Sequence, residues 1–181
     1  MSFQPVIPFA GFAGWSFLKR TMAKQAATLA ATPSAQRDED YFRAKIGTVK
    51  TAEALVADRR LLSVSLAAFG LEADINNKAF IRKFLEGGTL KPEALANRLA
   101  YKHYQKIVAA FGFGDFPVSR NQLSDFADKT LAQYRSRQFE AAVGQQNGAY
   151  RLALNAEREL PVLAARGISE DAKWFTVMGN R

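Results

Sequence analysis

The side chains that most often carry out chemistry in proteins are scarce in this chain of 181 residues. There is no cysteine, which excludes thiolate nucleophiles, disulfides and cysteine metal sites. The one histidine, His103, lies in the stretch YKHYQK, where packing between aromatic residues is a commoner role than general-base catalysis. Asp125 and Asp128 fall on one face of a helix, but no residue beside them completes an acid–base or metal site. We therefore predict a non-enzymatic protein with no catalytic residue, no metal site and no cofactor.

The charge of the chain raises a second possibility, which is nucleic-acid binding. The formal net charge is +8 and the pI is about 9.9. Residues 1–37 hold four basic and no acidic residues, whereas acidic residues are interleaved with basic ones over the rest of the chain. Pairs that could contact phosphates are Arg59 with Arg60, Arg82 with Lys83, and Arg135 with Arg137. A basic helical nucleic-acid-binding protein is therefore the alternative function.

Helices are the only elements that the hydrophobic pattern predicts. No stretch alternates cleanly with a period of two, and apolar residues recur every three or four positions, as at Trp15, Leu18 and Met22. We predict an all-α fold, a helical array of about seven or eight helices in a single domain over residues 1–181. No apolar run approaches the roughly 20 residues that cross a membrane, so no membrane span is expected.

Two segments of the chain resemble each other. Residues 38–74 and 78–115 both run through a helix, a glycine, Thr-apolar-Lys, Glu-Ala-Leu, a basic helix and Ala-Ala-Phe-Gly. The AAFG stretches lie 42 positions apart, a period typical of helical repeats. We predict an internal two-copy repeat in which Gly70 and Gly112 end helices in the left-handed conformation that glycine adopts freely.

Longer helices are predicted for residues 119–181. Ser119 and Gln122 have the spacing of a capping box that would start the first of them. The stretch VGQQNGAY, residues 143–150, interrupts the pattern. A last short helix carries Trp174, Phe175 and Met178.

Residues 1–14 form a predicted N-terminal arm that is strongly apolar and contains no acidic residue. The arm either covers the helices of its own chain or docks into a partner, and the sequence leaves both interpretations open. The candidate partner-binding residues are Phe9, Phe12, Trp15, Phe17 and Leu18.

Several stretches together resemble one family over essentially the whole chain: GWSFLKRT, YFRAKIGTVKTAEALVADRRLL, AAFGLE, FIRKFLEGG, NRLAYKHYQKIVAAFGF, QYRSRQFEAAVG and KWFTVMGNR. The chain resembles the uncharacterised bacterial family called domain of unknown function twelve-seventeen, whose members are often encoded among flagellar genes. The resemblance implies an all-α fold and supplies no catalytic residues.

The same resemblance implies a structural or protein-interaction role in the flagellum or its assembly. The expected partner is a protein, either a flagellar component or a second copy, and the expected location is cytoplasmic or flagellum-associated. In the family, WFTVMGNR resembles the beginning of a further helix, so a C-terminally truncated fragment is one interpretation of the chain.

Overall fold

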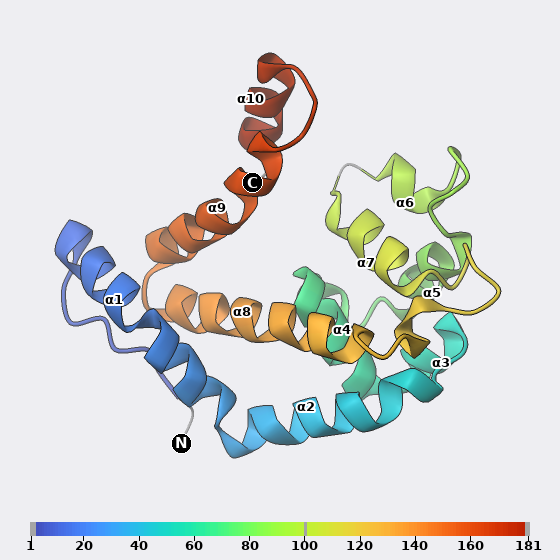
Figure 1. Ribbon diagram of the computed structural model, residues 1–181, viewed down its shortest axis with the longest axis horizontal. Coiled ribbons are helices and arrows are strands. Elements are labelled where there is room, and N and C mark those ends of the chain that lie inside the picture. The colour runs from blue at the N-terminus through green and yellow to red at the C-terminus, as the bar shows by residue number, and fades with distance from the viewer. Residues whose placement is uncertain (1–2, 100, 180–181) are drawn as a thin grey trace. The chain divides into compact units, whose positions relative to one another are not determined.

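Helices account for all the regular structure in the computed structural model, which describes residues 3–99 and 101–179 (Figure 1). Eight of its ten α-helices have seven or more residues, which confirms the all-α prediction and the expected number of helices. The α-helices are α1 (Gly11–Ala30), α2 (Pro33–Lys45), α3 (Ala52–Ala57), α4 (Arg59–Phe69), α5 (Lys78–Gly87), α6 (Leu95–Arg98), α7 (His103–Phe111), α8 (Phe126–Gln146), α9 (Gly148–Ala164) and α10 (Glu170–Gly179). Short 3₁₀ helices are η1 (Ile46–Thr48), η2 (Glu72–Asp74) and η3 (Arg120–Gln122).

The chain divides into two compact units. The central unit is Met22–Phe139, and the terminal unit combines Ser2–Thr21 with Glu140–Arg181, of which residues 3–21 and 140–179 are described. Helices α1 and α8 each contribute residues to both units. The assignment of residues 1–181 to a single domain stays a prediction.

The core of the central unit is built around α4, which contacts α2, α3 and α7. Eight of the eleven residues of α4 are buried, because the helix has neighbours on several sides. Such a helix must be apolar nearly all round. Phe42, Phe84 and Phe111 bring full-sized aromatic rings into the same core, and all three are inaccessible to solvent. These contacts bury the large side chains that the helical pattern places on the inner faces.

Both AAFG stretches end a helix as the sequence predicts. Gly70 and Gly112 have positive φ angles of 73° and 66°. At Gly70 the N–H of Leu71 donates to Leu66 O and the N–H of Gly70 to Ala67 O, which is the Schellman pattern. At Gly112 the N–H donates to Val108 O, which is the simpler αL ending.

The two predicted copies have the same order of elements, α2–α3–α4 and α5–α6–α7, but different side chains hold their connections. In the first, Asn121 Nδ2 donates to Ile46 O and to Val49 O, both at 2.7 Å. In the second, Asp115 accepts from the N–H groups of Thr89 and Leu90. The repeat as a structural unit stays a prediction.

Asp115 stabilises the second connection, and it does so as a negatively charged carboxylate. Burial alone would raise the pKa of its carboxyl group, but the N–H groups of Thr89 and Leu90 and the hydroxyl of Thr89 outweigh burial and lower that pKa below its usual value. The carboxylate satisfies backbone donors that the turn at Gly88 leaves without carbonyl partners.

The predicted capping box at Ser119 does not start a long helix. Gln122 Nε2 donates to Ser119 Oγ at 3.1 Å, but the residues between them form only η3. Leu123 then adopts an extended conformation, with φ −69° and ψ 142°, and α8 begins at Phe126. The predicted interruption within residues 143–150 is confirmed, because α8 ends at Gln146 and Asn147 caps α9.

Candidate protein-binding surface

The N-terminal segment of the terminal unit is hydrogen-bonded to the end of α8 and the start of α9. Tyr150 Oη donates to Gly11 O at 2.8 Å, and Gln146 Nε2 donates to Pro5 O. The extended segment is shorter than the predicted arm of residues 1–14, because α1 begins at Gly11, where φ is +59°. Met1 and Ser2 lie outside the described residues.

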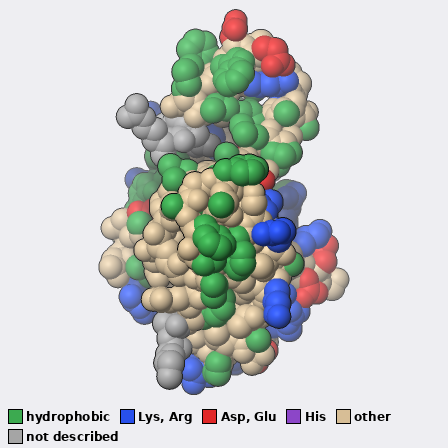
Figure 2. Space-filling model, turned by 90° about the vertical axis from the view of Figure 1, so that its left-hand side faces the viewer, with side chains coloured by type: hydrophobic (Ala, Val, Ile, Leu, Met, Phe, Trp, Pro, Cys, Tyr) green, Lys and Arg blue, Asp and Glu red, His purple; other side chains and the backbone are tan. Residues whose placement is uncertain are grey.

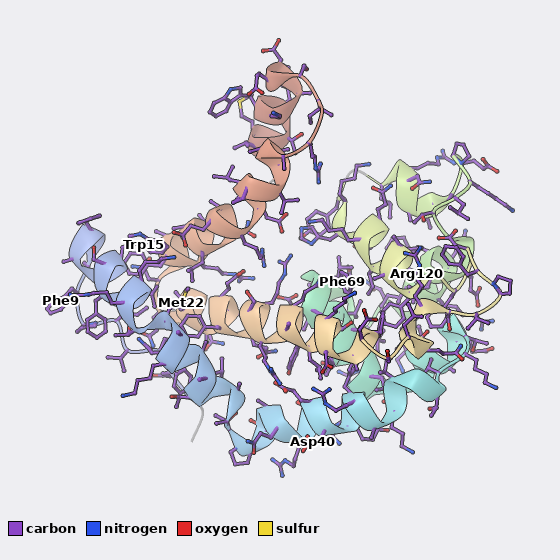
Figure 3. All side chains as sticks on the ribbon, viewed as in Figure 1. Phe9, Trp15, Met22, Asp40, Phe69 and Arg120 are labelled. Carbon is purple, nitrogen blue, oxygen red and sulfur yellow. The ribbon has the colours of Figure 1, made fainter. Side chains whose placement is uncertain are left out.

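Gly14 allows this segment to lie against α1. A Cβ at this position would be 2.0 Å from Phe9 O and 2.4 Å from Tyr150 Oη, so no other residue fits without displacing the backbone. Trp15 points from α1 toward the start of α9, where its ring centroid is 6.1 Å from that of Tyr150 (Figure 3). Lys19 Nζ lies 5.7 Å from the Trp15 ring centroid and 2.7 Å from Glu157 Oε2. These contacts order the apolar segment within its own unit.

The five predicted partner-binding residues differ in their accessibility. Phe12 is 84% exposed, and Phe9 is exposed although its ring makes a T-shaped contact with the ring of Phe17. Trp15 and Phe17 are half-buried, and Leu18 is fully buried. Phe9 and Phe12 therefore offer surface to a partner, whereas Leu18 packs in the interior in this structure.

A larger exposed apolar surface lies elsewhere in the terminal unit, outside the five residues predicted from the sequence to bind a partner. The terminal unit holds about a third of the chain but eleven of the sixteen large hydrophobic side chains that are exposed among the described residues. Hydrophobic side chains gather on the uppermost part of the surface in Figure 2, at the height of α10 in Figure 1. The eleven are Val6, Phe9, Phe12, Leu152, Leu160, Val162, Ile168, Trp174, Phe175, Val177 and Met178.

Helix α10 exposes its large apolar side chains to solvent, whereas most amphipathic helices turn such side chains toward the core. Trp174, Phe175 and Met178 are 64%, 70% and 63% exposed. With 3.6 residues per turn they form one stripe, because Met178 lies one turn beyond the two rings. The opposite face is made of Ala172, Lys173 and Thr176, which are only partly exposed. A helix whose large apolar side chains face solvent is typical of an interaction surface.

The charges beside this stripe balance. Lys173 Nζ is 2.8 Å from Glu170 Oε1, one turn away on α10. Arg166 and Asp171 are the other charged residues in the described segment 165–179, so it holds two charges of each sign. The segment that carries the stripe therefore has no net charge, in contrast to the basic chain as a whole.

His103, Asp125 and Asp128, the residues considered above for catalysis or metal binding, all make structural contacts. His103 Nδ1 is 2.6 Å from Phe69 O, at the end of α4, and the side chain is buried. Asp125 bonds to Lys129, which lowers the pKa of its carboxyl group, and Asp128 pairs with Arg43. Among the described residues no cluster of histidine, aspartate or glutamate could hold a metal ion.

One small cavity of about 20 Å³ lies in the central unit, lined in part by Ala26, Leu29 and Tyr134. Its volume accommodates about one water molecule. Burial raises the pKa of Tyr134 to about 12, and the negative charges of Asp38 and Glu39 add to this effect, so its hydroxyl group stays neutral at ordinary pH.

At least three of the six residues predicted to contact phosphates are paired with carboxylates. Arg60 pairs with Asp38, Arg82 with Glu53 and Glu86, and Arg135 with Glu39. Hydrogen bonding to Glu39 also raises the pKa of the Arg135 guanidinium group. No helix in the described part of the chain is both long and apolar enough to cross a membrane.

Comparison with known proteins places this architecture in a family. The family described as "Protein of unknown function (DUF1217)" matches residues 68–181. The chain belongs to this family. The match covers all helices from α5 to α10 and therefore the apolar stripe, and it confirms the resemblance seen in the sequence.

A solved structure has a similar fold. The crystal structure of protein AGR_C_984 from Agrobacterium tumefaciens matches with a TM-score of 0.76 and 27% sequence identity, over 88% of this chain and 71% of that one. None of the curated proteins compared with the chain matches it.

Proposed function

We propose that the chain is a non-enzymatic protein-interaction protein that acts in the bacterial flagellum or its assembly, and that the apolar surface of the terminal unit is its binding surface. The observation that supports this function is the concentration of exposed large apolar side chains in that unit, above all on helix α10. Contiguous apolar patches on a protein surface commonly mark sites of protein binding. The flagellar part of the proposal rests on the family resemblance.

Nucleic-acid binding has weaker support from the same structure. At least three of the six arginine and lysine residues that could contact phosphates are paired with carboxylates, and each pairing lowers the positive charge that a phosphate backbone would meet.

Motility of a flagellated host tests the proposal. In a strain from which the gene is deleted, we expect impaired swimming that the natural chain restores and the double variant Phe12→Ser, Phe175→Ser does not. Both replaced side chains are exposed, so the free energy of unfolding should change by less than about 1 kcal/mol.

The matched control is Leu90→Ser, Val118→Ser, which removes two apolar side chains of the central unit that are 68% and 64% exposed, and it should restore swimming. A deletion strain that swims normally would contradict the flagellar role. Equal behaviour of the two double variants would contradict the assignment of the binding surface to the terminal unit.

A further inference from the structure

We infer that the occupant of the α10 stripe is the same stripe of a second copy of this chain, packed antiparallel about a two-fold axis. This inference rests on the proposed function, because it names the partner of the same surface. Its starting point is the orientation of α10, where Trp174, Phe175 and Met178 face outward and the smaller residues Ala172 and Thr176 face inward. Thr176 Oγ1 donates to Ala172 O, so the inner face satisfies its polar group within the helix.

The charges favour a neutral partner. Arg166 and Lys173 balance Glu170 and Asp171 beside the stripe, so a strongly basic or acidic partner would gain no attraction there. An anionic lipid surface is disfavoured for the same reason, because helices that lie on membranes carry unpaired lysine and arginine on their polar face. On α10 the one lysine is paired with Glu170.

The geometry favours a copy of the same helix. A two-fold contact brings a patch against itself, so the patch must be complementary to itself. A neutral apolar stripe meets that condition, and antiparallel packing sets the helix dipoles in opposite directions. Trp174 and Phe175 lie near the middle of α10, so the rings of one copy would meet those of the other.

The exposed area sets the strength of this contact. At their exposed fractions, Trp174 and Phe175 alone offer roughly 300 Å² of apolar surface per copy. With Met178, Val177 and Ile168 added, two copies would bury on the order of 1,000 Å², which is at the lower end of specific interfaces. We therefore expect a dimer that dissociates in the micromolar range rather than a permanent one.

Sedimentation of the purified chain measures this association. Between about 1 µM and about 100 µM, a range that spans dissociation of a contact of this size, the mass should rise from 20.0 kDa toward twice that value. Salt should strengthen the dimer, because it screens the repulsion between two chains of net charge +8. The variant Trp174→Ser, Met178→Ser should stay a monomer at every concentration with an unchanged melting temperature.

A cysteine placed on the stripe tests the geometry, because the chain has no cysteine of its own. Under mild oxidation, Phe175→Cys should form at least about tenfold more disulfide-linked dimer than Leu90→Cys, since a disulfide needs its two Cα atoms within about 7 Å. Leu90 is the control because it is 68% exposed and belongs to the central unit.

A natural chain that stays monomeric over the whole range would overturn the inference, and so would equal cross-linking at the two positions. A rise in mass that Trp174→Ser, Met178→Ser leaves unchanged would overturn it too. If the chain is monomeric but the terminal-unit variant still fails to restore swimming, the second copy is the wrong occupant and the proposed function stands. If the chain dimerises through α10 but both double variants restore swimming, the proposed function fails and the dimer stands.

Discussion

Asn121→Asp is expected to destabilise the chain by about 3–5 kcal/mol, although the two side chains have nearly the same shape. Asn121 is 1% exposed, and its Nδ2 group donates to both Ile46 O and Val49 O. An aspartate would set a buried carboxylate against two carbonyl oxygens and would lose both donors. Urea unfolding followed by circular dichroism measures the loss.

The pH dependence gives this prediction a second readout. Burial beside two carbonyl oxygens disfavours the charged form, so the pKa of the introduced carboxyl group is higher in the folded chain than in the unfolded one. The destabilisation should therefore grow as the pH rises above about 4, the usual pKa of an aspartate, and shrink below it, where the protonated group can donate one hydrogen bond. A loss of stability that is independent of pH would contradict the proposed contact.

The matched control is Asn147→Asp, the same chemical change at a side chain that accepts hydrogen bonds and does not donate them in the contacts described. Asn147 Oδ1 accepts from the N–H groups of Ala149 and Tyr150 at the start of α9. A carboxylate accepts the same bonds, and negative charge is favourable at that end of a helix. We expect a change of less than about 0.5 kcal/mol at neutral pH.

Phe111→Ala is expected to lower the free energy of unfolding by about 3–5 kcal/mol, because it leaves a cavity in the core at the end of the second AAFG stretch. The Phe111 side chain is fully buried, with ring centroids 5.4 Å from Phe113 and 4.9 Å from Phe126. The rigid packing of three rings leaves little freedom for the neighbours to fill the space. Thermal unfolding compared with the natural chain checks the prediction.

Phe116→Ala is the control for this change, five positions further along the chain. Phe116 is partly exposed, and its ring centroid lies 4.5 Å from the guanidinium carbon of Arg120. Loss of that contact should cost on the order of 1 kcal/mol. Equal losses for Phe111→Ala and Phe116→Ala would contradict the placement of Phe111 at the centre of the core.

Local patterns in the sequence were sufficient to predict the helices and several of their ends. The apolar spacing of three to four residues predicts helix wherever it persists, and glycine at 70 and 112 predicts the left-handed endings because only glycine enters that conformation without cost. The break between α8 and α9 follows in the same way from the stretch around Asn147.

Contacts between distant parts of the chain could not be predicted in this way. Asn121 bonds to carbonyl groups 72 and 75 residues earlier, and nothing in its sequence neighbourhood signals this. The helical spacing of Trp174, Phe175 and Met178 defines a stripe but not whether it faces inward or outward, so the candidates in the sequence came from the N-terminal segment alone. Leu18, one of those candidates, is buried because the fold covers its side of α1.

The binding role of the α10 stripe is tested most directly by whether the stripe touches protein in the cell. A phenylalanine analogue that carries a benzophenone group can be placed at position 175 in the flagellated host and activated by light, with position 90 as the equally exposed control. We predict a cross-linked product larger than 20.0 kDa from position 175 and none from position 90, and a product of twice that mass would identify the second copy. The absence of any product from position 175, or equal products from both positions, would contradict the assignment of this surface to protein binding.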